Sequence, residues 1–398
     1  MFKIIVFIVF AVTTARAQTA APDTTAISQH LVQRSEHLAQ GLQHIHVYSD
    51  STKSGAPINI HILRAELDLI EVRPVLAAGQ IIGQEMTSSM VKRHGALAGV
   101  NGGFSYSNNP WSIYHGDLRG FFVQDGQLIS EPNDSAWAVQ IKSTPNHRQV
   151  LSLVQPKLRV TFQIEGASDI SCSGLNRERK DDDCIVYTPI WNRTTLADTS
   201  GVEVVVSAGE IKAVREGLPS AIIPPDGFVV SAKGAQAERL RKMHVGTSVA
   251  VAFDLMNIAD GKHLPFKDHH YVSAGPLLVR GGKPVSEYEG HHWFHKSPFT
   301  HQRHPRTAIA WTENKREVML VTVDGRQPDH SVGFTLPELA DFLVKQGAHT
   351  VYNMDGGGST TMAIGGEVVN HFSDVWGGRL GDKPIERRRC DALLLFSR

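Results

Sequence analysis

The sequence has few cysteines, no excess of charge of either sign, and no later apolar run long enough to cross a membrane. It has 398 residues, with three cysteines and with 40 basic residues against 40 acidic ones. The cysteine spacings do not pair into a zinc site made of thiolates. A nucleic-acid partner would want a basic surface, which this balance of charges does not supply. Hydrophobic residues nevertheless make up 41% of the chain, which is enough for a folded core.

Three common ligand-binding motifs are also missing. The glycines show neither the spacing of a P-loop nor that of a Rossmann fingerprint, and no His-Glu-x-x-His zinc motif occurs. We therefore expect no cofactor and no metal ligand.

The N-terminus has the features of a secretory signal peptide. Lys3 precedes an apolar run at residues 4–12, and Ala15 and Ala17 form a small-x-small cleavage site. About nine apolar residues are too few for a transmembrane helix, which needs about 20. We predict that residues 1–17 are removed, which takes away two of the 40 basic residues and no acid. A periplasmic or secreted protein without a membrane span follows from this prediction.

The rest of the chain contains no repeat and no low-complexity linker. Residues 18–57 are polar and predict an N-terminal extension with a possible helix at residues 27–42. Residues 58–398 then form one domain with an insertion-like middle. Strand patterns and helix patterns both occur in it, so we expect an α+β (mixed α/β) fold of mixed β-sheets with flanking helices. Its active site should lie at the carboxyl ends of strands in the C-terminal third.

Two of the three cysteines flank a polar loop. Cys172 and Cys184 enclose residues 173–183, and export permits disulfides, so we predict a bridge between them. Cys390 opens an apolar run and is predicted to be a buried thiol.

The C-terminal third predicts a hairpin followed by a crossover. Strands at residues 307–312 and 317–323 are joined by a polar turn, which places Arg306 near Asp324. Thr335 and Glu338 form a capping box at the start of a helix that ends at Gly347. A strand at residues 349–354 follows it. Strand-helix-strand crossovers normally make the two strands parallel, so both carboxyl ends reach one sheet edge.

That edge gathers several loops that are ordinary turns when taken singly. It brings together Asp324, Arg326 and Asp355, and the Gly365-Gly366 hairpin returns Asn370 to the same mouth. The consecutive glycines at residues 356–358 allow a concave nest of backbone N–H groups that suits an anion. Arginine forks suit phosphate, and carboxylates suit work on a glycosidic bond.

The ordered motifs resemble those of the phosphodiester glycosidase domain family. The resemblance rests on residues 101–104 (Asn-Gly-Gly-Phe), 306–309 (Arg-Thr-Ala-Ile), 323–326 (Val-Asp-Gly-Arg), 353–360 (Asn-Met-Asp-Gly-Gly-Gly-Ser-Thr), 368–370 and 386–387. It extends from about residue 58 to residue 396. Ser105 and Met354 depart from the residues common in the family at those positions.

The resemblance implies hydrolysis at the anomeric carbon of a sugar-1-phosphodiester, similar to one of N-acetylglucosamine. It implies catalytic roles for the acidic residues Asp324, Asp355 and Glu386. Substrate and phosphate binding is implied for Asn101, Gly102, Gly103, Arg306, Arg326, Gly356, Gly357, Gly358, Ser359, Thr360, Asn370 and Arg387. The expected partner is a small or polymeric sugar phosphate, with no nucleic acid.

Two other functions remain open from the sequence. A non-catalytic protein that binds cell-surface glycopolymers would keep the arginines and glycines but would not need the carboxylates. A metal-dependent hydrolase would use the long histidine-rich loop at residues 263–304. Its histidines are His263, His269, His270, His291, His292, His295, His301 and His304.

Overall fold

The computed structural model describes residues 8–11, 27, 29–50, 54–105, 112–133, 136–144, 146, 148–288, 291–373, 379–380 and 383–398. The predicted signal peptide lies outside these residues, apart from the backbone of residues 8–11, which pairs with the next strand. The described residues contain no helix that is both long and apolar enough to span a membrane.

The protein is mostly β-sheet, so the expected mixed α/β fold is wrong. Strands account for 46% of the structure and helices for 11%. Among the described strands, every pairing is antiparallel except that of β15 with β16. The helices are short because most connections between strands are hairpins, and a hairpin returns the chain without a helix. The helices are α1 (Thr87–His94), α2 (Ala237–Arg241), α3 (Pro298–His301) and α4 (Leu336–Lys345), with 3-10 turns η1 (Ala77–Gly79), η2 (Gly234–Gln236), η3 (His292–Lys296) and η4 (Gly357–Ser359).

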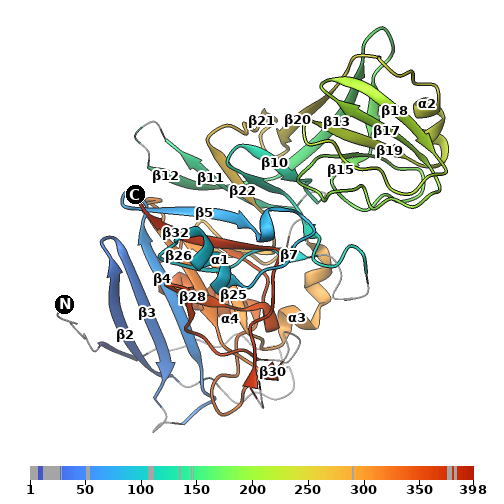
Figure 1. The fold of residues 1–398 in the computed structure, drawn as a ribbon. Helices are drawn as coiled ribbons and strands as arrows, with labels where there is room; N and C mark the ends of the chain where they lie inside the picture. The colour runs from blue at the N-terminus through green and yellow to red at the C-terminus, as the bar shows by residue number, and fades with distance from the viewer. Residues whose placement is uncertain are drawn as a thin grey trace.

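Two sheets form the body of the molecule (Figure 1). The larger sheet has the order β1 (Ile8–Ala11), β2 (His30–Ala39), β3 (Leu42–Ser49), β4 (Asn59–Glu66), β26 (Glu317–Val323), β25 (Arg306–Trp311), β27 (Thr350–Asn353), β23 (Leu277–Arg280) and β24 (Lys283–Pro284). The smaller sheet has the order β29 (Glu367–Val368), β28 (Met362–Ile364), β6 (Ala98–Asn101), β32 (Asp391–Ser397) and β5 (Ile70–Leu76). Apolar residues of both sheets share one buried cluster, which includes Leu320 and Leu393.

The middle of the chain forms a lobe beside the body (Figure 1). A sheet of β10 (Gln127–Ser130), β9 (Phe122–Gln124), β22 (His269–Val272), β11 (Ala138–Ser143) and β12 (Gln149–Val154) leads to it. The lobe contains β14 (Ile170–Cys172), β13 (Pro156–Ile164), β20 (Val249–Asn257) and β21 (Lys262–His263), and β15 (Gly174–Leu175), β16 (Cys184–Tyr187), β19 (Gly227–Ala232), β17 (Val202–Ser207) and β18 (Glu210–Glu216). Two short pairs complete the chain, β7 (Phe104–Ser105) with β8 (Leu118–Arg119) and β30 (Arg379–Leu380) with β31 (Lys383–Pro384). One hydrophobic cluster lies mostly in the lobe and the sheet that leads to it, whereas other lobe residues, such as Tyr187 and Val229, belong to the cluster shared by the two sheets of the body.

The segment expected as a helical extension is a β-hairpin of the larger sheet. β2 pairs with β3, and residues 42–48 of β3 pair with β4. The turn is made by Gly41, whose φ of 75° favours glycine. Residues 30–39 have an ambiguous local pattern, and the available edge of β3 decides in favour of a strand.

The crossover brings its two strands to one edge in the predicted direction. β26 and β27 both pair antiparallel with β25, which lies between them, so β26 and β27 run parallel without touching. α4 connects them and packs Leu336, Leu339 and Leu343 into a cluster that includes Val321 of β26. The carboxyl ends of β26 and β27 therefore share an edge although the sheet is antiparallel.

The capping box of α4 is present as predicted. The side chain of Thr335 accepts a hydrogen bond from the Glu338 backbone N–H at 3.2 Å, and the Glu338 carboxylate accepts one from the Thr335 N–H at 2.8 Å. We expect Thr335→Ala to lower the free energy of unfolding by about 1 kcal/mol, because the Glu338 backbone N–H loses its hydroxyl acceptor. Urea denaturation measures the change. Thr335→Ser keeps the hydroxyl and should keep most of the stability; an equal loss in both variants would contradict the cap.

Candidate active site

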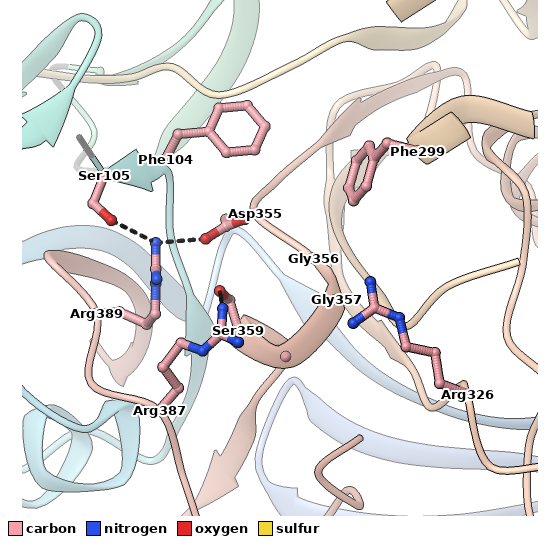
Figure 2. A pocket seen from close by; sticks show the side chains of 11 residues that line it. Phe104, Ser105, Phe299, Arg326, Asp355, Gly356, Gly357, Ser359, Arg387 and Arg389 are labelled. Atoms are coloured by element: carbon pink, nitrogen blue, oxygen red, sulfur yellow. Dashed lines mark hydrogen bonds and ion pairs between the residues drawn. The ribbon is translucent and has the colours of Figure 1, made fainter. Parts of the chain in front are cut away.

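A cleft of about 350 Å³ opens at the shared edge of β26 and β27. This volume lies in the range of sites that hold a small ligand. Figure 2 shows the glycine loop at its base, with arginines on both sides. The described residues that line it are Phe104, Ser105, Phe299, Arg326, Asp355, Gly356, Gly357, Gly358, Ser359, Arg387 and Arg389.

The glycine loop requires its glycines for two separate reasons. Gly357 has a φ of 63°, and a Cβ added there would lie 3.1 Å from Nη2 of Arg326. A Cβ added at Gly356 would lie 2.9 Å from the Pro305 carbonyl oxygen. A side chain at either position would strain the backbone or displace a neighbour. The loop therefore presents bare backbone to the cleft.

An ion pair joins the loop to the opposite wall. Nη2 of Arg389 lies 2.5 Å from Oδ2 of Asp355 and donates to the Ser105 hydroxyl at 3.0 Å. Arg389 is only 4% exposed and Asp355 is 15% exposed. Burial alone would lower the pKa of Arg389, but the charge of Asp355 and of other acids raises it overall. The pair therefore stays charged and holds the Asp355 carboxylate in place.

Arg389 is a lining residue that the sequence analysis did not single out. Arg387 and Arg389 stand two apart in a run of three arginines before β32, and both line the cleft. Spacing by two places side chains on one face of an extended chain. That spacing, together with the prediction that Arg387 is a site residue, could have identified Arg389 from the sequence.

The other two lining arginines contact polar groups at the rim. Nη1 of Arg387 lies 3.4 Å from the Ser359 hydroxyl. Arg326 stands on the other side of the loop (Figure 2), and its Nε donates to Nδ1 of His304 at 3.1 Å. Arg326 has a φ of 59°, which is unusual for a residue with a side chain.

Two aromatic rings form the upper walls of the cleft, Phe104 on one side and Phe299 on the other (Figure 2). Neither was named as a site residue, although Phe104 closes the Asn-Gly-Gly-Phe motif. The guanidinium of Arg306 lies 4.4 Å from the centre of the Phe299 ring. Apolar walls beside charged groups suit a ligand with a ring and an anionic group.

Arg306 is buried behind the cleft and does not line it. Its guanidinium donates to the backbone oxygens of Phe299, Gln302 and Phe334 at 2.5–2.9 Å. Burial and then the charge of Arg326 lower its pKa. In this geometry Arg306 positions the segment that carries Phe299.

Asp324 and Glu386 do not line the cleft either. Asp324 is fully buried, and burial would raise its pKa, but hydrogen bonds from His330 and His371 lower it overall. Glu386 accepts hydrogen bonds from the backbone N–H of Ser88 at 3.0 Å and its hydroxyl at 2.5 Å, at the start of α1. Burial raises the pKa of Glu386. Asp355 alone of the three candidate acids lines the cleft.

The remaining predicted binding residues are buried around the loop. The Asn101 side chain donates to the Asp355 carbonyl oxygen at 2.6 Å. The N–H of Gly103 donates to the Asp391 carboxylate, and a Cβ at Gly102 would lie 2.0 Å from that carboxylate. Asn370 donates to the Thr360 carbonyl oxygen at 3.1 Å. These contacts support the loop from beneath.

The histidine-rich segment does not form a metal cluster among the described residues. His269 bonds the Lys267 carbonyl oxygen, His291 bonds that of Ala274, and His301 bonds that of His295. In the part of the chain that the structure describes, the group that could hold a metal lies elsewhere. The histidines separate because they stand on different elements, β22, η3 and α3.

His304 is expected to stay neutral through the physiological pH range. Burial, together with the charges of Arg306 and Arg326, lowers its pKa to about 4. An unfolded histidine titrates near pH 6.5, so between about pH 6.5 and 4 the unfolded chain binds this proton and the folded chain does not. Stability should therefore fall as the pH falls through that window.

An NMR titration of His304 checks this, with His304→Gln for assignment and as a control that keeps an acceptor for Arg326. We expect a midpoint near pH 4. A midpoint near 6.5 would show that the buried environment of His304 beside Arg306 and Arg326 does not hold in solution.

The comparisons with known proteins point to one family. Residues 200–393 match the family model described as phosphodiester glycosidase. A stretch of 69 residues is 38% identical to N-acetylglucosamine-1-phosphodiester alpha-N-acetylglucosaminidase of Bos taurus and covers 17% of this chain. A stretch of 78 residues is 36% identical to the enzyme of the same name from Homo sapiens and covers 20% of this chain. The matches span only 12% and 15% of the lengths of those two relatives.

A solved structure supports the fold. A protein from Burkholderia pseudomallei K96243 superposes with a TM-score of 0.78 at 21% identity, covering 96% of this chain and 100% of that one. All three lining arginines and Asp355 lie inside the stretch that matches the family model. The resemblance indicated by the ordered motifs is therefore confirmed over residues 200–393, which match the phosphodiester glycosidase family model.

Proposed function

We propose that the protein is an exported hydrolase that cleaves the glycosidic bond of a sugar-1-phosphodiester such as one of N-acetylglucosamine. The observation that carries the proposal is the charge of the cleft. Among the described residues that line it, the guanidiniums of Arg326, Arg387 and Arg389 gather with the Asp355 carboxylate beside the bare glycine backbone. Such a cleft favours an anionic ligand that also presents a bond for a carboxylate to act on.

The phosphate would be held by the glycine loop and the rim arginines. Arg326 and Arg387 stand on opposite sides of the loop (Figure 2), so their forks converge on an anion above Gly357. Phe104 and Phe299 offer apolar faces to the sugar ring. The curated relatives are named for a phosphodiester of N-acetylglucosamine, which agrees with this division of the cleft.

Asp355 is the proposed catalytic carboxylate. Its carboxylate pairs with Arg389, and in the proposed reaction it attacks the anomeric carbon or takes a proton from water. The bond from the anomeric carbon to the phosphate oxygen breaks, and the electron pair leaves with the phosphate monoester. Water supplies the hydroxyl of the released sugar. A phosphate leaving group is already stable as an anion, so the need for a general acid is small.

We expect Asp355→Asn to reduce kcat on a GlcNAc-1-phosphodiester by at least about 100-fold, as is typical when a catalytic acid or base is lost. Arg387→Gln should raise KM for that substrate. It should change KM for a neutral aryl glycoside much less, because only the phosphodiester carries the phosphate charge. Arg241→Gln is the matched control, since Arg241 pairs with Glu216 on the surface of the lobe.

Two outcomes would overturn the assignment. Equal turnover by wild type and Asp355→Asn would remove the carboxylate from the mechanism. Tight binding of the phosphodiester without turnover by the wild type would favour the glycopolymer-binding alternative.

The proposed export leads to a separate prediction, a disulfide between the two cysteines of the lobe. The structure holds Cys172 and Cys184 as buried free thiols, with their sulfur atoms 3.4 Å apart. We propose that they form the predicted disulfide in an oxidising compartment. Alkylation of the unfolded secreted protein without reductant should then modify one thiol, that of Cys390, and alkylation after reduction should modify three. Three modified thiols in both samples would contradict the bridge.

A further inference from the structure

A second cluster of functional side chains lies outside the cleft, where β26 ends. It consists of Asp324, His330 and His371, and one ligand atom of each lies within 4.8 Å of the others. Nε2 of His330 is 2.8 Å and Nδ1 of His371 is 3.6 Å from Oδ2 of Asp324. The two imidazole rings have their centres 4.2 Å apart. Two nitrogens therefore converge on one carboxylate oxygen.

The backbone around Asp324 fixes which oxygen faces the imidazoles. Its N–H donates to the Asn59 carbonyl oxygen at 2.9 Å, and its own carbonyl oxygen accepts from the Ser331 hydroxyl at 2.6 Å. Oδ1 accepts from the His371 backbone N–H at 3.0 Å and from the Asn370 amide at 3.3 Å. Oδ2 is thus presented to the two histidines. Hydrogen bonds to the second oxygen are the usual support of a metal-binding carboxylate.

We propose that Asp324, His330 and His371 bind a divalent transition metal such as Zn²⁺, with Asp324 as a monodentate ligand. Two imidazole nitrogens and one carboxylate oxygen suit zinc and its neighbours, whereas calcium and magnesium prefer oxygen ligands. Zinc lies about 2.0–2.2 Å from such atoms, so two ligand atoms of one tetrahedral zinc stand roughly 3.3–3.6 Å apart. The His371–Asp324 spacing already matches this, and the 2.8 Å contact of His330 with Asp324 has to open only slightly. The sequence pointed to no metal ligand outside the histidine-rich loop, and this site does not use that loop.

The exposure of the cluster allows a metal to enter. The side chain of His371 is 64% exposed and that of His330 is 28% exposed, while Asp324 is fully buried. Three protein ligands on an open face leave a coordination position for water. The buried carboxylate anchors the site, and the two histidines close over the ion from the solvent side.

The proposed metal site is also connected, through Asn370, to the end of the glycine loop. Asn370 donates both to Oδ1 of Asp324 and to the carbonyl oxygen of Thr360, at 3.3 Å and 3.1 Å. A metal on Asp324 would therefore stiffen the loop from behind without entering the cleft. The proposal stands whether or not the protein hydrolyses sugar phosphodiesters, because it concerns binding alone.

The test is equilibrium dialysis of the full, untagged chain against Zn²⁺, followed by elemental analysis. We expect about one zinc per chain for the wild type. His371→Ala and His330→Ala should each reduce zinc affinity by at least about 10-fold. His263→Ala is the matched control, because His263 is an exposed histidine of the lobe that pairs with Asp254. It should bind zinc as the wild type does.

Two further measurements separate loss of the site from loss of the fold. Zn²⁺ should raise the thermal midpoint of the wild type and of His263→Ala but not that of His371→Ala, whose circular dichroism should match the wild type. Co²⁺ should give visible absorption bands that vanish in His330→Ala. Absence of stoichiometric zinc in the wild type, or zinc retained by both ligand variants, would overturn the proposal.

Discussion

One buried side-chain amide, that of Asn101, holds the two sheets of the body together at the site. Asn101 ends β6 in the smaller sheet, and its oxygen accepts from the Thr307 hydroxyl on β25 of the larger sheet at 2.8 Å. The same oxygen accepts from the N–H of Thr361, and the amide nitrogen donates to the carbonyl oxygen of Asp355. Both ends of the glycine loop are therefore tied to one fully buried group. Leaving such a group unpaired is costly, so the loop position follows from the sheet packing.

The electrostatics of the cleft follow from this support. A buried guanidinium such as that of Arg389 is stable only beside a partner, and Asp355 reaches it because the loop is held in place. The rim arginines Arg326 and Arg387 then place guanidiniums beside the glycine loop. A phosphate suits such donors, and the aromatic walls leave space for a ring beside it.

Asp324 links the cleft to the second cluster. Its position at the end of β26 made it a candidate for catalysis, yet its oxygens face Asn370, His330 and His371. Through Asn370 it contacts the end of the glycine loop, so one carboxylate supports both places. The proposed metal and the proposed phosphate site are neighbours that share this support.

Much of the local structure near the site could be predicted from sequence. The capping box at Thr335, the hairpin before Asp324 and the common edge of residues 324 and 355 follow from short patterns whose physics is local. Of the residues predicted for the site, Arg326, Arg387 and Asp355 line the cleft. The mostly β architecture was not predicted, because residues 30–39 become a strand only through the free edge of β3.

The division between lining and supporting residues was decided by the tertiary structure alone. The sequence by itself determined that arginines, glycines and carboxylates converge at one edge of a sheet. It did not determine that Arg306 turns behind Phe299, that Glu386 caps α1, or that His371 meets His330 across Asp324. The direction of a side chain depends on the partners that bury it, and those partners lie far away in sequence. The motifs therefore indicated the type of chemistry, whereas the role of each residue could be assigned only from the tertiary packing.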